Sequence, residues 1–271
     1  MNTIKLSFEP GARKDLFCAY FEKNGFPDAL KSDKDSVYID TTSDNINIIA
    51  VFIQKNFKDE TIRRILEKNF GYFTAVQQAD ILKTFNSLPQ NTQYEIQLIL
   101  AELENAFTET DELSFSGFVN FRLKAYGEYI ENLIDSAVQK FIAQKEFAEF
   151  TAMLKFFVSV AECKISYIAI LPQDDIYKLL DEKYIDITQR CLLEFMSEGS
   201  RSAIINFDDL VLSTLINNSP KKIVIYNPDK FTNRELYDTI LNVFEGRVTC
   251  ADFPDGYDFA ENNVVEINAP Q

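Results

Sequence analysis

KIVIYNPDKFTNRELYDTILNVFEGRVTC, residues 222–250, is the stretch that decides the fold class of this chain. Its first five residues predict a short buried strand, and GRVTC at its end predicts another. Between them, residues 232–235 have the pattern of a capping box, and Leu236, Ile240 and Val243 share one face of the helix that follows. A strand–helix–strand segment of this length favours two parallel strands joined by a right-handed crossover.

Other segments of the chain show similar strand and helix periodicities. Residues 164–170 and 176–179 alternate between polar and apolar, which predicts a hairpin around a turn at 172–175. Asn206 or Asp208 begins a helix. At the other end of the chain, residues 3–8 and 36–40 read as strands, each followed by a helical pattern, and Asp44 is placed to cap the second helix. The chain therefore opens with a β-α-β-α unit.

The middle of the chain, from residue 71 to about 161, predicts helices and no strand. Residues 108–112 read as a polar linker, and two apolar stripes fall out of phase at 143–146, where we expect a hairpin or kink. The fold class is α+β: a small N-terminal β-α-β-α unit, a helical middle, and a C-terminal α/β unit with a short mixed sheet. We place the domains at 1–110 and 111–271, with one compact body as the alternative.

Composition excludes several classes of function. The 271 residues carry 27 basic and 42 acidic side chains, a net charge of −15, and contain no histidine. Histidine is the commonest general base and metal ligand, so its absence removes many catalytic arrangements. With 8 glycines there is no G-x-G-x-x-G motif or P-loop. An acidic surface repels phosphate, so nucleic acid is not an expected partner, and no cofactor is expected.

The chain shows no sign of export or membrane insertion. No apolar stretch approaches the roughly 20 residues that a membrane span requires, and the N-terminus does not read as a signal peptide. A cytoplasmic location is the expectation. Cys18, Cys163, Cys191 and Cys250 lie far apart, so we expect free thiols without metal, with two disulfides as the alternative.

Clustered carboxylates are the main candidates for catalysis. Acidic pairs stand at residues 174–175, 181–182 and 208–209, and Asp175 with Asp209 is the candidate cluster for Mg²⁺ chemistry. The first pair lies in a predicted turn and the third at a helix start, where acid complements the helix dipole, so a structural role is favoured. Arg63, Arg64 and Lys68 form a basic group that is best explained by a helix C-terminus.

The most distinctive stretch is GFVNFRLKAY, residues 117–126. Phe118, Phe121 and Tyr126 cannot share one narrow helical seam, and Arg122 stands among them. One interpretation is a buried Arg122 held by a carboxylate such as Glu146. The other is a surface for protein interaction made of Phe118, Phe121, Arg122 and Tyr126, because aromatic and Arg side chains dominate binding hot spots.

This stretch, taken in order with residues 145–158, 209–223 and 243–250, resembles the YtxC-like family, which is associated with sporulation in endospore-forming Firmicutes. Relatives often carry further cysteines after the position of Cys250, whereas Ala251 and Asp252 follow here, which counts against a shared thiol or metal role. The family has no established enzymatic activity. The resemblance therefore implies a biological context and no chemistry.

Two functions from different classes follow. The first is a sporulation-associated, non-enzymatic module that binds an unidentified protein partner. The alternative is a metal-dependent hydrolase or nuclease that uses clustered carboxylates. The absence of histidine, the lack of a phosphate-binding loop and the acidic excess favour the first.

Overall fold

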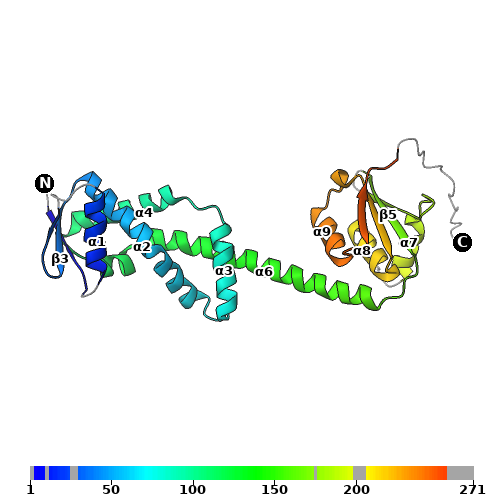
Figure 1. Ribbon diagram of the computed structural model, residues 1–271, viewed down its shortest axis with the longest axis horizontal. Coiled ribbons are helices and arrows are strands. Elements are labelled where there is room, and N and C mark those ends of the chain that lie inside the picture. The colour runs from blue at the N-terminus through cyan, green and yellow to red at the C-terminus, as the bar shows by residue number, and fades with distance from the viewer. Residues whose placement is uncertain (1–2, 10–11, 25–29, 174–175, 198–205, 255–271) are drawn as a thin grey trace, which may run out of the picture. The chain divides into compact units, whose positions relative to one another are not determined.

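A computed structural model describes residues 3–9, 12–24, 30–173, 176–197 and 206–254 (Figure 1). The chain forms two compact units, Met1–Gln144 and Lys145–Gln271. Each unit contains one small four-stranded mixed sheet with helices packed on it, which confirms the α+β class. The boundary falls within a helix and not near residue 110.

The sheet of the first unit has the order β2-β3-β1-β4. Its strands are β1 (Thr3–Ser7), β2 (Leu30–Ser32), β3 (Ser36–Asp40) and β4 (Glu112–Ser114). β1 pairs antiparallel with β3 and parallel with β4. The alternation read in residues 3–8 is borne out, because Ile4 and Leu6 are buried. β4 begins at Glu112, the last residue of the predicted linker, so the prediction of a strand-free middle was wrong.

Helices make up the rest of the first unit. They are α1 (Ala12–Lys23), α2 (Ser43–Asn69), α3 (Ala75–Ser87), α4 (Thr92–Glu109), the single turn α5 (Phe115–Gly117), the π-helical turn η2 (Phe118–Arg122) and the start of α6 (Lys124–Val160). Thr42, not Asp44, caps α2, because its side chain accepts the backbone N–H of Asn45. Phenylalanines from the sheet side and from α1, α2 and α5 pack together at the centre of the core, with ring centroids 4.8–6.0 Å apart.

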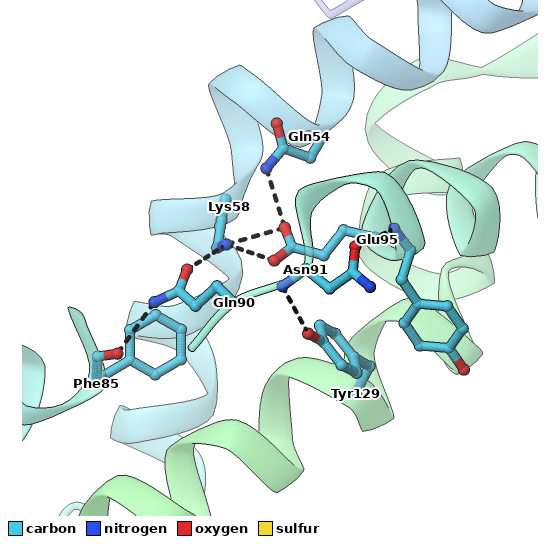
Figure 2. Close-up of polar contacts among 8 residues, drawn as sticks. Gln54, Lys58, Phe85, Gln90, Asn91, Glu95 and Tyr129 are labelled. Carbon is cyan, nitrogen blue, oxygen red and sulfur yellow. Dashed lines mark hydrogen bonds and ion pairs between the residues drawn. The ribbon is translucent and has the colours of Figure 1, made fainter. Parts of the chain in front are cut away.

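A buried ion pair joins α2 to α4 (Figure 2). Lys58 Nζ lies 2.6 Å from Oε1 and 2.9 Å from Oε2 of Glu95, whose side chain is fully shielded from water. Gln54 donates a further hydrogen bond to Glu95, and Gln90 accepts one from Lys58. The charges are thus paired and hydrogen-bonded, which a buried carboxylate requires.

The second unit contains the segment that opened the sequence argument. Its sheet has the order β6-β5-β7-β8, and its strands are β5 (Tyr167–Gln173), β6 (Ile176–Leu180), β7 (Lys222–Tyr226) and β8 (Val248–Ala251). β5 and β6 form the predicted antiparallel hairpin, and β7 and β8 are parallel as predicted. Asn233 is the N-cap of α9 (Arg234–Val243). The capping box predicted at 232–235 had placed the cap at Thr232, one residue earlier.

Two further helices, α7 (Thr188–Ser197) and α8 (Phe207–Asn218), and the short turn η3 (Pro228–Lys230) complete this unit. Asn206 caps α8. At the other end of α8, Ser219 adopts a positive φ of 40°, and its hydroxyl donates to the carbonyl of Val158 in α6 at 3.0 Å. Leu154 and Val158 of α6 are buried in the core of this unit.

α6 runs without interruption from Lys124 to Val160 (Figure 1). The hairpin expected at 143–146 is therefore wrong, whereas a kink at this point stays a prediction. Both apolar stripes exist, but they belong to one helix: Tyr126, Ile130 and Ile134 enter the core of the first unit, and Leu154 and Val158 enter the core of the second. The change of phase marks a change of packing partner.

Candidate functional site

A groove of about 630 Å³ lies in the first unit, between the C-terminal half of α2 and the segment formed by η2 and the first turns of α6. Ile65 and Leu123 are buried beneath it. Its lining is otherwise polar or charged, with one large exception. Phe121 stands at the groove with 78% of its surface exposed.

The π-helical turn η2 explains this exposure. Phe118 and Val119 enter the core, and so does Leu123 after the turn, while the three residues between them face solvent. A π-turn is wider than an α-turn and is frequent at functional sites. Here it allows the chain to bury residues on both sides of Phe121 while Phe121 itself points outward.

Both neighbours of Phe121 are held in place by other helices. Arg64 of α2 donates from Nη1 to the backbone carbonyl and to Oδ1 of Asn120, at 3.2 Å and 2.9 Å. Arg122 Nη1 lies 2.9 Å from Glu109 Oε2 at the end of α4. Exposed contacts of this kind contribute little free energy, so the backbone at Phe121 is held mainly by the burial of Phe118, Val119 and Leu123 on either side of it.

The groove is more basic than the protein as a whole. Arg64, Lys68 and Lys124 line it together with Glu128 and Glu131, in a chain of net charge −15. Asn69 donates to Glu131 at 2.6 Å. Within the described ranges neither Lys68 nor Lys124 has an ion-pair partner, and both are exposed. The ammonium groups are therefore available to carboxylates of a bound molecule.

The four predicted interaction residues divide into two pairs. Phe121 and Arg122 are exposed, whereas Phe118 and Tyr126 are each 1% exposed and belong to the core. The Tyr126 hydroxyl has no hydrogen-bond partner among the described residues. Burial, reinforced by the nearby negative charge of Glu95, raises the pKa of Tyr126. The interaction surface stays a prediction, and Phe118 and Tyr126 position it from below.

Arg122 is not the buried arginine that the alternative interpretation required. Its side chain is 48% exposed, and it pairs with Glu109 and not with Glu146. The basic group at Arg64 and Lys68 was visible in the sequence as a helix-end feature. Its contact with Asn120, 56 residues away, had no signal in the sequence, and Lys124 was not singled out as part of the group.

The carboxylates proposed for catalysis do not form a cluster in the described part of the chain. Asp175 lies outside the described residues, and Asp209 is exposed in the first turn of α8. Its neighbour Asp208 accepts a hydrogen bond from Asn233, and Asp181 accepts two backbone N–H groups of its own turn. Among residues with a described position, no three Asp, Glu or Cys side chains converge as metal ligands would.

All four cysteines are free thiols. Cys163 and Cys250 are exposed, whereas Cys191 is buried between α7 and α8. Burial raises the pKa of the Cys191 thiol to about 11, which keeps it protonated and unreactive at neutral pH. None of the described helices combines the length and apolar character needed to cross a membrane.

Comparison with known proteins agrees with the family resemblance. A model of the YtxC-like family matches residues 45–249, a range that contains every residue of the groove. The "Uncharacterized protein YtxC" of Bacillus subtilis (strain 168) is 22% identical over 214 residues, which cover 74% of this chain and 74% of that protein. No solved structure matches the chain.

Proposed function

The chain belongs to the YtxC-like family, and from that premise we propose that it is a sporulation-associated, non-enzymatic module that binds a protein partner through the groove at Phe121. One observation carries the interaction role. Phe121 is 78% exposed although Val119 and Leu123, on either side of it, are buried in the core. Exposure of a large apolar side chain to water is unfavourable, and its burial against a partner lowers the free energy.

The groove also specifies the chemistry of the partner. Burying the ring of Phe121 contributes about 1.5–2 kcal/mol, provided that the partner offers an apolar surface. Arg64, Lys68 and Lys124 then favour carboxylates beside that surface. We therefore expect an acidic segment of a protein that carries at least one bulky apolar side chain.

The sporulation role rests on the association of the family and is tested separately. Deletion of the gene should leave vegetative growth nearly normal and alter sporulation. A strong vegetative growth defect with normal spores would contradict this role.

Photo-crosslinking in sporulating cells tests the groove. Benzoylphenylalanine in place of Phe121 should yield one dominant protein adduct. The same replacement at Tyr72, which is 73% exposed and lies outside the groove, should not yield it. Mass spectrometry of the adduct should locate an acidic, partly apolar segment. An identical adduct pattern at both positions, or crosslinks to nucleic acid, would refute the proposal.

A further inference from the structure

The second half of α6 carries a stripe of large apolar side chains that the described residues cover only in part. Phe150, Met153, Phe157 and Val160 follow one another at intervals of three, four and three residues, and Phe156 lies beside them. Their exposed fractions run from 41% at Phe150 to 65% at Val160. This stripe is not the face that packs on the second unit, since Leu154 and Val158 serve that purpose.

The exposed area of the stripe is large for a surface left in water. A side chain of this size exposes roughly 150–200 Å² when it is free, so the five side chains leave about 400–500 Å² of apolar surface. The largest apolar patch of a typical monomer is about 300–600 Å², and patches of that size are commonly functional. The stripe is therefore large enough to be a binding surface.

We infer that the stripe binds the same stripe of a second copy of this chain. Two copies together supply about 800–1,000 Å² of apolar surface. A standard interface buries about 1,600 Å², of which about 65% is apolar in homodimers, or roughly 1,000 Å². Complete burial of both stripes would supply most of this apolar area.

Local charge also permits self-association. The chain as a whole carries −15, but residues 145–160 contain Lys145 and Lys155 against Glu146 and Glu149, which balance. Lys145 pairs with Glu149, and Lys155 pairs with Glu245 of the same unit. Two copies can therefore meet at this stretch of helix with less repulsion than the net charge of −15 would give elsewhere.

The spacing of the stripe fits a helix-to-helix contact about a two-fold axis. Phe150, Met153, Phe157 and Val160 occupy successive a and d positions of a heptad repeat, the pattern that packs side chains of one helix between those of another. A two-fold arrangement uses the same patch on both copies. Because the pattern covers only two heptads, we expect a dimer with a dissociation constant of about 1–100 µM.

Analytical ultracentrifugation of the full chain, over this range of concentrations, tests the inference. The wild type should pass from monomer to dimer. Met153→Lys and Val160→Lys should each weaken the dimer at least about 100-fold, because each buries an unpaired charge. Val76→Lys is the matched control: Val76 is a helical valine of the first unit with 72% exposure, and its substitution should change the constant by less than about twofold.

Two further measurements keep the test decisive. Circular dichroism must show wild-type helix content in both stripe variants, and Phe121→Ala should leave the dimer intact, because this contact does not depend on the groove. Higher salt should tighten the dimer, since it screens the net charge of −15. A wild-type chain that is monomeric at every concentration, a dimer unaffected by both stripe variants, or a dimer that weakens in salt would overturn the inference.

Discussion

Replacing Lys58 by methionine should strongly destabilise the first unit. The change leaves the carboxylate of Glu95, whose side chain has no exposed surface, with a single hydrogen bond, from Gln54. Methionine has about the volume of the lysine stem, so the packing is kept and the lost charge is the main effect. Removing one partner of a buried ion pair costs about 3–5 kcal/mol.

The magnitude can be measured as a shift in melting temperature. For a unit of this size 1 kcal/mol corresponds to about 3–5 °C, so Lys58→Met should lower the transition of the first unit by roughly 10–20 °C in differential scanning calorimetry. The double variant Lys58→Met with Glu95→Gln should recover most of this loss, because a neutral amide can remain buried at a lower cost.

An exposed pair provides the control. Lys83 and Asp80 lie 2.8 Å apart on the surface of α3, and Lys83 is 78% exposed. Lys83→Met should cost less than about 0.5 kcal/mol. If Lys58→Met costs no more than Lys83→Met, or if adding Glu95→Gln makes the loss greater, the reasoning from a desolvated charge is refuted.

Three other outcomes are expected. Once a partner is identified, Phe121→Ala should weaken its binding about 10–30-fold in isothermal titration, whereas Tyr72→Ala should not, and equal losses would argue against the groove. A thiol reagent should modify the exposed Cys163 and Cys250 in the native protein before Cys191, and equal rates would contradict the burial of Cys191. The pKa of Cys191 rises from its ordinary value of 9.0 to about 11 because it is buried. The folded chain therefore keeps a proton that the unfolded chain releases, and stability should fall as the pH rises from about 9 to about 11. Cys191→Ala should flatten that decline in thermal melts, and an unchanged slope would show that another group controls it.

The local sequence was sufficient to predict those strands and helices whose own residues show a complete polar and apolar periodicity. The alternation in β1 and the apolar face of α9 each indicate an element packed on one side, and the buried run of β7 indicates a strand covered on both faces. Together with residues 164–170 and 176–179, these patterns predicted the α+β class, the β5–β6 hairpin and the parallel arrangement of β7 and β8. The parallel pairing of β5 with β7 was not predicted. The caps of α2 and α9 were misplaced by one or two residues, since several neighbouring side chains are capable of capping.

The candidate site was only half visible in the sequence. The sequence identified the segment 118–126 as unusual, but periodicity has no means of showing a π-turn, so it could not separate Phe121, which is exposed, from Phe118 and Tyr126, which are buried. The anchoring of Asn120 by Arg64 joins residues 56 positions apart. Such contacts depend on the tertiary fold and leave no mark on either segment alone.

What the sequence determined by itself is the set of elements with strong local periodicity, the acidic surface and the absence of histidine chemistry. Only the tertiary structure decided the rest. β4 is three residues long and exists because β1 offers it an edge. The two stripes of α6 enter two different cores, although they belong to one continuous helix. Glu95 is buried in an amphipathic helix because Lys58 neutralises it. In each case the deciding interaction comes from a distant part of the chain, and its free energy exceeds the local preference.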